Sequence, residues 1–426
     1  MRMRPFGELM EYSRARQLLL DRVEPVRRIE PVPLVRALGR VISRELRAPH
    51  NVPAFARATW DGYALRSVST RGARPGRPVS LELAGEVFAE GALHRRLSEG
   101  EAVAIATGGA MPRGADTVII FEETRVVGST LWVPRYVRPG ERVANPGEDF
   151  RRGSRLARAN EVLTPAALGA LASTGASRVA VFAQPVVSIL PNGNELRAPG
   201  GRLGPGQIHE SNNATLGAVV TACGGIPRPL PPLPDVETRI ERAIRNALDA
   251  SDLVLVTGGS SVGEHDYLPA IFPRLGRLLF HGIAVRPGKP TLAALSRRRL
   301  VIGMPGHPTS CLSNALWLLQ PVLRRLGRLP GPGWVEGSAR LAGTAMVPSP
   351  GLATVVPLAV RHGWARPTFR DSSAITSLSG ANAYTLLEPN ARPLRKGARI
   401  PVNFLLPPLA ADPFGGPPAA RIGREG

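Results

Sequence analysis

Glycine-rich turns that directly follow short apolar runs carry the residues best suited to chemistry in this chain. The first is Thr257-Gly258-Gly259-Ser260-Ser261-Val262-Gly263, which follows the run 253–256, and Asp266 stands three residues after it. Glycine lets the backbone approach a ligand, and successive N–H groups can cradle a phosphate or a similar oxyanion. A carboxylate beside such a cradle can bind Mg²⁺ or a hydroxyl group. The turn therefore predicts an anion site, with a plain glycine turn and a surface aspartate as the alternative.

A second turn, Arg286-Pro287-Gly288-Lys289-Pro290, places two cations around a proline-stiffened loop. Such a loop suits an anion held against the backbone. Lys289 and Lys396 are the only lysines, because every other basic residue is arginine. A compact ammonium group in such a chain indicates a specific role, and chance retention is the alternative. A third turn, Gly303-Met304-Pro305-Gly306-His307-Pro308, is of the rigid kind that shapes a pocket.

Other carboxylates stand in loops or next to expected helices. They are Asp61 in Trp60-Asp61-Gly62-Tyr63-Ala64, Asp149 in Gly147-Glu148-Asp149, Glu195 in Asn192-Gly193-Asn194-Glu195-Leu196, and Glu210 in His209-Glu210-Ser211-Asn212. Taken singly, each is more typical of a turn or a cap, and Ser211 or Asn212 is expected to cap the following helix. The His and Cys residues show no zinc-ligand spacing. Neither a Gly-x-Ser-x-Gly elbow nor a Walker motif is present.

The three turns belong to a region in which apolar runs alternate with helical patterns. The runs 186–190 and 253–256 are separated by helical patterns at 213–222 and 237–250, and a further strand at 300–302 precedes a last helix at 317–326. Buried strands that alternate with helices indicate a parallel α/β sheet. Ligands of such sheets bind outside the carboxyl ends of the strands, where these turns lie.

The rest of the chain has a different texture. Helical spacing from Leu9 to Val23 is followed by short β-like runs between about 52 and 142, and by a helix over Pro165 to Ser173 with proline in its first turn. After a linker at 330–333, residues 334–406 are again β-like. The tail at 407–426 is rich in Pro, Gly and Ala and is expected to be disordered.

Length and composition limit the classes of protein. At about 100–200 residues per domain, 426 residues indicate two to four domains. No apolar run approaches the ~20 residues of a membrane span, no signal peptide is apparent, and two cysteines cannot build a disulfide framework, so a cytoplasmic protein is expected. The formal net charge of +21 suggests an anionic partner. The arginines are nevertheless scattered, which favours codon bias over a nucleic-acid surface.

Taken together and in order, these segments resemble the molybdopterin molybdenumtransferase family, the molybdenum insertases of the MoeA and gephyrin type. The matching segments are Pro53-Ala54-Phe55, Asp61-Gly62-Tyr63-Ala64, Thr107-Gly108, Met111-Pro112, Gly114-Ala115-Asp116, Gly147-Glu148-Asp149, Gly193, Glu195-Leu196, Gly206-Gln207-Ile208, Ser211-Asn212, Asp235, Gly258-Gly259, Ser261-Val262-Gly263, Asp266, Pro287-Gly288-Lys289-Pro290, Pro305-Gly306, Pro308, Ile375-Thr376-Ser377-Leu378 and Ala381-Asn382. One such motif is weak, but this many at family spacing is specific.

The resemblance implies a multidomain fold with α/β and β parts. A helical, elongated domain is expected from 1–50 and 143–184, with a β-rich domain inserted at 51–142. A parallel α/β molybdopterin-binding domain at 185–329, a small C-terminal β-barrel at 334–408 and a disordered tail at 409–426 follow. The resemblance also implies a homodimer whose cleft combines the inserted domain of one subunit with the α/β domain of the other. Neither nucleic acid nor membrane is an expected partner, whereas a molybdopterin adenylyltransferase and molybdoenzymes that accept the cofactor are candidates.

The activity implied is insertion of molybdate into adenylylated molybdopterin with Mg²⁺, releasing AMP and molybdenum cofactor. The implied catalytic residues are Asp61, Thr107, Asp149, Glu195, Asp266 and Lys289. Implied substrate contacts come from Gly258, Gly259, Ser261, Gly263, Arg286, Pro287, Gly288, Pro305, Gly306, Pro308, Ser211 and Asn212. Implied metal ligands are Asp235, Asp266 and Glu195. Molybdate is expected near Lys289.

The chain departs from the family pattern at Asn194, where the family often has aspartate; at Trp60, where methionine is common; and at Arg286 and His307, where lysine and asparagine are frequent. Asn194 could weaken metal binding or could lie outside the metal ligands. Two alternatives stay open: a non-catalytic protein of the same fold that binds a molybdopterin nucleotide or acts as a scaffold, and the adenylyltransferase. Standalone adenylyltransferase domains are much shorter and lack the inserted and barrel domains.

Overall fold

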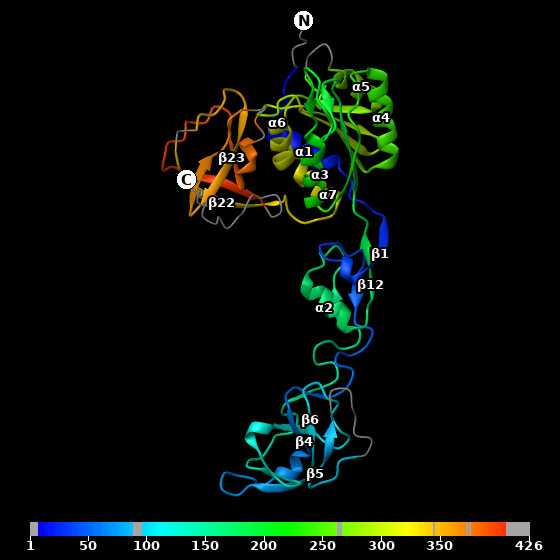
Figure 1. Cartoon of the computed structure of the whole chain (residues 1–426), viewed down its shortest axis with the longest axis vertical. Helices are drawn as coiled ribbons and strands as arrows, with labels where there is room; N and C mark the ends of the chain where they lie inside the picture. The colour runs from blue at the N-terminus through cyan, green and yellow to red at the C-terminus, as the bar shows by residue number, and fades with distance from the viewer. Residues whose placement is uncertain are drawn as a thin grey trace, which may run out of the picture. The chain divides into compact units, whose positions relative to one another are not determined.

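The computed structural model of the chain describes residues 7–87, 96–261, 266–343, 346–371, 374 and 376–405. The chain forms two compact units (Figure 1). The α/β unit comprises Met1–Glu30, Gly39–Val41 and Val181–Gly426, and the β unit comprises Pro31–Leu38 and Ile42–Ala180. The multidomain fold with α/β and β-rich parts is confirmed, whereas the boundaries of the four expected domains stay a prediction. No helix in the described part of the chain is long and apolar enough to cross a membrane.

A six-stranded sheet forms the centre of the α/β unit. Its order is β16 (Ile226–Pro229), β13 (Val186–Pro191), β17 (Leu253–Thr257), β21 (Arg299–Met304), β20 (Leu292–Ser296) and β18 (Arg277–His281). The first four strands are parallel, as expected. β20 is the reversed strand, antiparallel to both of its neighbours, β21 and β18, and the expectation of a parallel sheet did not include it. The two-residue turn Arg297-Arg298 between β20 and β21 sets this direction, because so short a connection can only join antiparallel neighbours.

Helices cover both faces of this sheet (Figure 1). On β17, Leu253 and Leu255 pack into one core, whereas Val254 and Val256 pack into the other. This explains why the strand is a continuous apolar run. The first core also holds α1 (Tyr12–Arg22), α3 (Asn212–Ala222) and α7 (Gln320–Leu326), and the second holds α4 (Glu237–Ala250) and α5 (Leu268–Leu275).

The last helix of the α/β region begins nine residues earlier than expected. It consists of α6 (Pro308–Asn314), a π-helical turn over Ala315–Leu319, and α7. Pro308 begins it, since proline fits the first helical position. Thr309, Ser310 and Asn314 are polar but buried, so this part of the helix has no apolar periodicity that could reveal it in the sequence.

A second sheet follows the α/β region in the same unit. Its order is β19 (Val285–Arg286), β23 (Ala353–Arg361), β24 (Trp364–Pro367), β22 (Trp334–Leu341), β26 (Arg399–Leu405) and β25 (Ala383–Leu387). An additional pairing of β23 with β25 closes the last five strands into a barrel. The short helix α8 (Thr376–Ser379) precedes β25. The expected small C-terminal barrel is therefore present, while the motif residue Ile375 and the tail 409–426 lie outside the described residues.

The β unit contains a six-stranded sheet of order β7 (Thr117–Ile120), β4 (Gly62–Leu65), β6 (Glu101–Ile105), β5 (Val79–Val87), β9 (Thr130–Val133) and β8 (Arg125–Val127). The expected helix over 165–173 is α2 (Pro165–Ser173). Short strand pairs complete the fold: β2 (Leu46–Arg47) with β11 (Arg155–Ala157), β3 (Arg57–Ala58) with β10 (Val143–Ala144), and β1 (Ile29–Pro33) with β12 (Arg178–Phe182). The chain passes between the two units along this last pair.

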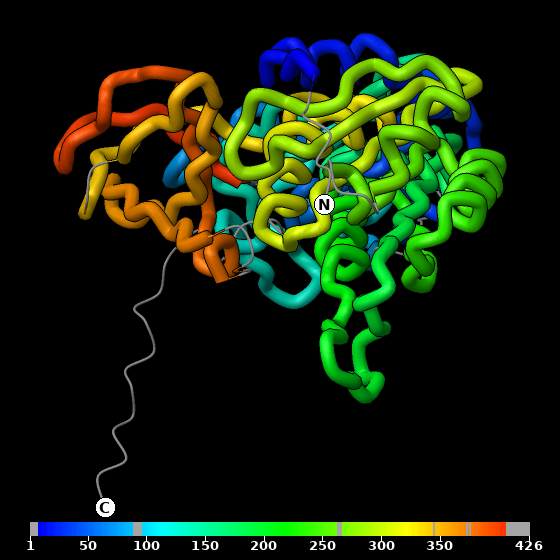
Figure 2. The backbone as a smooth tube through the Cα atoms, turned by 90° about the horizontal axis from the view of Figure 1, so that it is seen from above, coloured from blue at the N-terminus to red at the C-terminus, as the bar shows by residue number. Residues whose placement is uncertain are grey.

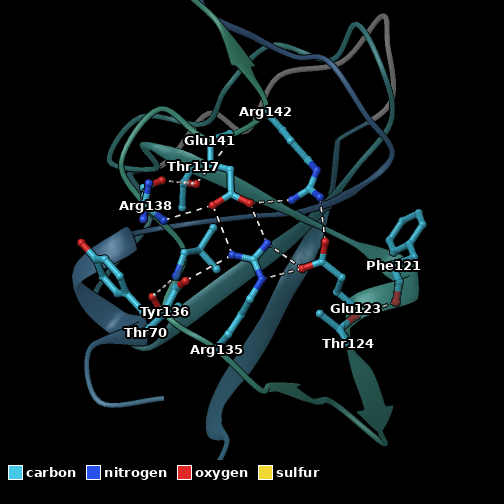
Figure 3. A network of polar contacts seen from close by, with 11 residues as sticks. Thr70, Thr117, Phe121, Glu123, Thr124, Arg135, Tyr136, Arg138, Glu141 and Arg142 are labelled. Atoms are coloured by element: carbon cyan, nitrogen blue, oxygen red, sulfur yellow. Dashed lines mark hydrogen bonds and ion pairs between the residues drawn. The ribbon is translucent and has the colours of Figure 1, made fainter. Parts of the chain in front are cut away.

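A network of four charged side chains holds two loops of the β unit together (Figure 3). The Arg135 guanidinium lies 2.6 Å from carboxylate oxygens of both Glu123 and Glu141, and Arg142 pairs with the same two carboxylates at 2.7 Å. The hydrogen bond from Arg135 lowers the pKa of Glu141 below its ordinary value. The stabilisation that Glu141 contributes to the folded unit is therefore present only while Glu141 is ionised.

We expect Glu141→Gln to lower the free energy of unfolding of the β unit at pH 7 by about 1–2 kcal/mol, because Arg135 and Arg142 lose a charged partner. The pKa of Glu141 is lowered by folding, so this difference from the wild type is complete above the ordinary value of 4.5 and disappears as the pH falls through the lowered value. This difference in the free energy of unfolding is measured by urea unfolding of the full-length chain, in which pulsed hydrogen exchange reports the unfolding of the segments of the β unit. The exposed Glu86→Gln serves as control, and equal effects of both variants would contradict the prediction.

Candidate functional site

Three adjacent parallel strands end at the same level and place the turns that follow them side by side, and two of these, after β17 and β21, are turns that the sequence predicts. Pro191 at the end of β13 pairs with Thr257 at the end of β17, which pairs in turn with Met304 at the end of β21. The turns that follow these residues line a cavity of about 550 Å³. The cavity thus lies at the carboxyl ends of the strands, where the sequence predicts it.

The cavity brings together most of the predicted site residues of the α/β unit. They are Glu195, Ser211, Asn212, Asp235, Gly258, Gly259, Ser261, Asp266, Pro305, Gly306 and Pro308. Gly263 lies outside the described residues. The short parallel pair β14 (Leu196–Arg197) and β15 (Ile208–His209) forms one wall, and the loop between these strands extends away from the sheet (Figure 2).

Close backbone contact between the turn after β13 and the turn after β17 explains the glycine at position 258. Gly258 has a φ of +85°, and a Cβ there would lie 2.4 Å from the carbonyl oxygen of Asn192. Any larger residue would therefore push the turns after β13 and β17 apart. The turn after β21 lies against the turn after β17, since a Cβ at Gly306 would be 3.4 Å from the Gly258 Cα. The Asn212 side-chain N–H donates to the Gly306 carbonyl at 2.9 Å, which ties this turn to the start of α3. The cavity floor is a backbone surface, which suits recognition of an oxyanion.

Three carboxylates, those of Glu195, Asp235 and Asp266, face this floor from separate segments. Within the described ranges, no three His, Cys, Asp or Glu side chains are close enough to hold a metal ion by themselves. Mg²⁺ is usually bound by one or two carboxylates together with substrate phosphates and water. The carboxylates therefore fit a metal that arrives with, or is completed by, a phosphorylated ligand.

Asn194 lies outside the cavity lining and holds Asp235 in place. The Asn194 backbone N–H donates to the Asp235 carboxylate at 3.0 Å, and the Asp235 backbone N–H donates to the Asn194 side-chain oxygen at 3.1 Å. Only an acceptor oxygen is needed at position 194, and both Asn and Asp supply one. The neutral residue therefore leaves this contact intact.

The second predicted turn borders the cavity through Pro290. Gly288 is buried with a φ of +110°, and a Cβ there would lie 2.2 Å from the Asn314 side chain, so glycine is required. Asn314 donates to the Gly288 carbonyl at 3.0 Å, which ties the turn to α6. The side chains of Arg286 and Lys289 are exposed. Neither side chain is among the residues that line the cavity.

Glu210 is a cavity residue that sequence reasoning passed over in favour of its neighbours. Only 3% of Glu210 is exposed, and its carboxylate accepts the Asn213 backbone N–H at 3.0 Å. Burial raises the pKa of Glu210. Ser211 occupies the cap position of α3, as expected, but its side chain makes no capping bond, and Glu210 accepts the N–H instead. The position of Glu210 just before a helical pattern is the signal in the sequence that could have identified it as the capping residue.

The predicted site residues of the β unit, Asp61, Thr107 and Asp149, all lie in loops between strands. The Thr107 hydroxyl and backbone N–H both donate to Asp61, at 2.8 and 2.6 Å, and these bonds lower the pKa of Asp61. The Asp149 backbone N–H donates to the Val52 carbonyl at 3.0 Å. Asp61, Thr107 and Asp149 are all exposed, as is Trp60 beside them.

Comparison with protein families matches nearly the whole chain in three consecutive parts. Residues 10–175 match the MoeA N-terminal region (domain I and II), residues 188–325 match a probable molybdopterin binding domain, and residues 340–405 match the MoeA C-terminal region (domain IV). A molybdopterin molybdenumtransferase of Bacillus subtilis is 32% identical over 386 residues, covering 88% of this chain and 90% of the relative. One from Nostoc is 32% identical over 320 residues, covering 74% of this chain and 73% of the relative.

Solved structures agree with these matches. A molybdopterin biosynthesis MoeA protein from Pyrococcus horikoshii has a TM-score of 0.81 and 31% sequence identity, covering 93% of this chain and 99% of that one. A second structure from the same species has a TM-score of 0.78 and 28% identity, covering 93% and 100%. The similarity therefore extends over the fold as a whole.

We expect Asn194→Ala to release the Asp235 turn, because the Asp235 N–H loses its acceptor. Amide exchange in the segment 233–236 should become about tenfold faster, the equivalent of about 1.4 kcal/mol, whereas Asn194→Asp should retain the slow exchange. Hydrogen-exchange mass spectrometry measures both. Asn390→Ala, which removes a comparable bond to the Gly351 N–H, should leave 233–236 unchanged. Unchanged exchange in Asn194→Ala would show that the contact does not hold the turn.

Proposed function

The chain belongs to the MoeA family, whose curated relatives are molybdopterin molybdenumtransferases, and from this premise we propose that it inserts molybdenum into molybdopterin. The observation that carries this function is the 32% identity over 88% of the chain to such an enzyme. The cavity at the ends of β13, β17 and β21 is the site that we assign to the reaction.

We propose that the substrates are molybdate and adenylylated molybdopterin, and that AMP leaves as molybdenum is inserted. Both substrates are anionic, which suits the glycine turn of the cavity floor at Gly258 and Gly259, where the absence of side chains lets a ligand approach the backbone. In this proposal the phosphates bind at this floor, and molybdate binds near Lys289, whose turn borders the cavity through Pro290. Arg286 supplies a second positive charge on the same turn.

We also propose Mg²⁺ as the cofactor, held by Glu195, Asp235 and Asp266 with the substrate phosphates. When bound, the ion stabilises the charge that develops on the phosphates as the phosphoanhydride bond breaks. Asp235 is oriented for this by its two hydrogen bonds with Asn194. Glu195 and Asp266 reach the cavity from separate turns, and the substrate phosphates would complete the set of ligands around the ion.

Two alternatives receive less support. A non-catalytic protein of the same fold is suggested only by Asn194, and this residue positions Asp235 from outside the cavity lining. A molybdopterin adenylyltransferase does not account for the N-terminal and C-terminal regions, which match their counterparts in MoeA.

We further propose that the protein works in the cytoplasm as a homodimer, and that Asp61, Thr107 and Asp149 position substrate in the site of the other subunit. The exposure of these three residues supports a role toward a partner surface. The bonds that Thr107 donates to Asp61 keep that carboxylate ionised and fixed in direction.

We expect Lys289→Ala to reduce molybdate-dependent AMP release from adenylylated molybdopterin by about 10²-fold, because the anion loses its positive partner. Lys289→Arg should restore only part of the activity, since a planar guanidinium is larger than an ammonium group. Lys396→Ala, at the only other lysine, is the matched control and should retain full activity. Full activity in Lys289→Ala would exclude this role for Lys289, whereas a wild-type protein without molybdate-dependent release would exclude the function itself.

We expect two inactive variants to complement each other when they form mixed dimers. Asp61→Asn and Asp266→Asn, mixed as unfolded chains in equal amounts and refolded, should regain about a quarter of wild-type activity, because half of the dimers then contain one intact site. The pair Asp235→Asn and Asp266→Asn should regain none, since both changes affect the same part of the site. Absence of recovery in the first mixture would place all these residues in one subunit or exclude the dimer.

A further inference from the structure

One row of the C-terminal barrel places three arginines and a tryptophan on four neighbouring strands. Arg399 of β26 pairs with Arg340 of β22, Arg340 pairs with Trp364 of β24, and Trp364 pairs with Arg361 of β23. Paired residues of adjacent strands project from the same face of a sheet, about 5 Å apart. Arg366, two residues after Trp364, lies on this face as well. These five residues form what we call the arginine face.

The arginine face is the outer surface of the barrel. All five residues are exposed, and Trp364 retains 45% of its accessible surface. The residues that alternate with them point the other way into the barrel core, which includes Ala339, Ala365 and Ile400. The alternation along the strands therefore directs these side chains toward solvent, because a slip of one residue would instead expose the apolar residues of the barrel core.

The arginine face is not neutralised by its surroundings. Among the described residues, no hydrogen bond or ion pair involves the side chains of Arg340, Arg361 or Arg366. Arg399 donates to the uncharged hydroxyl of Ser338. The nearest carboxylate along β22 is Glu336, four residues before Arg340 and therefore about 13 Å away along the strand.

Such a row costs stability. Like charges placed directly opposite each other on neighbouring strands are destabilising. Some other arginines of the chain are neutralised, as in the pairing of Arg135 with two glutamates. An exposed tryptophan flanked by arginines has the composition of the residues that dominate binding energy at protein interfaces.

We propose that the arginine face binds an acidic protein partner, with Trp364 as the apolar anchor and the four arginines paired with carboxylates of that partner. The partner is expected to present a cluster of Asp and Glu around an exposed apolar side chain. Binding would satisfy the guanidinium groups bidentately and relieve their mutual repulsion. This proposal is independent of the active-site assignment, because none of the five residues lines the cavity.

Other occupants fit less well. A second copy of this chain carries 54 Lys and Arg residues against 33 Asp and Glu residues, so it offers no excess of carboxylates to pair with the four arginines of this face. The chain's own segment 406–426 carries Asp412 and Glu425 against Arg421 and Arg424, so it offers no excess of negative charge. Single-stranded nucleic acid usually stacks successive bases on several aromatic side chains, whereas the arginine face has one. Charge complementarity therefore favours an acidic protein.

The test uses the full-length chain and a short fluorescein-labelled peptide of alternating Glu and Leu as probe, with fluorescence anisotropy as readout. We expect Arg340→Gln combined with Arg361→Gln to weaken binding about tenfold or more. Arg239→Gln combined with Arg242→Gln removes the same charge from exposed positions of α4 and should weaken it less than about twofold. Trp364→Ala should weaken it at least about threefold without a change of charge.

The results that would overturn the proposal are distinct. Equal weakening by the two arginine pairs would show attraction by net charge alone. Equal binding of the same peptide with Gln in place of Glu would exclude carboxylate recognition. Stronger binding of labelled oligothymidylate, sensitive to Trp364→Ala, would assign the face to nucleic acid, and failure of the acidic peptide to bind would exclude the site. Because Arg340→Gln and Arg361→Gln remove like charges, an unchanged or raised melting temperature confirms that the variant is folded.

Discussion

The common register of β13, β17 and β21 is the constraint on which the rest of this site depends. Pro191, Thr257 and Met304 stand opposite one another, so the three turns that follow begin at one level and meet. β17 is buried on both faces, and a slip of one residue would send every one of its side chains to the opposite core. Burial of the strand on both faces therefore fixes its register, and with it the position of Gly258 against Asn192.

Because of this constraint, the backbone and the side chains have different roles in the site: the backbone forms the floor of the cavity, and the side chains supply the carboxylates. The floor of the cavity is made by turns that only glycine can form, as the close approach of Gly258 to Asn192 shows. The carboxylates come from outside the three turns or from their far ends, and Asp235 needs a second residue, Asn194, to hold it. In the function that we propose, the floor binds the phosphates and a small oxyanion, and the carboxylates bind the metal together with those phosphates.

The arginines that give the chain its large positive charge include some that are paired with carboxylates and some that are not. Arg135 and Arg142 are closed into a network with two glutamates, and Arg28 forms a two-point ion pair with Asp252. The arginine face has no such partners among the described residues. Composition suggested codon bias as the common origin of all these arginines, and the structure now separates those that are paired with carboxylates from those of the arginine face.

The sequence by itself determined the family, the order of the helical, β-like and α/β regions along the chain, and the glycine and proline turns of the site. These features are local, because apolar runs, turn residues and motif spacing act within a few positions. It also identified Asp61 and Thr107, which the structure joins by two hydrogen bonds. Tertiary structure decided the antiparallel edge of the main sheet, the early start of α6, the capping role of Glu210 and the contact of Asn194 with Asp235. Each of these depends on a neighbour that is remote in the chain or on burial of a polar residue, and neither leaves a periodic signal in the sequence.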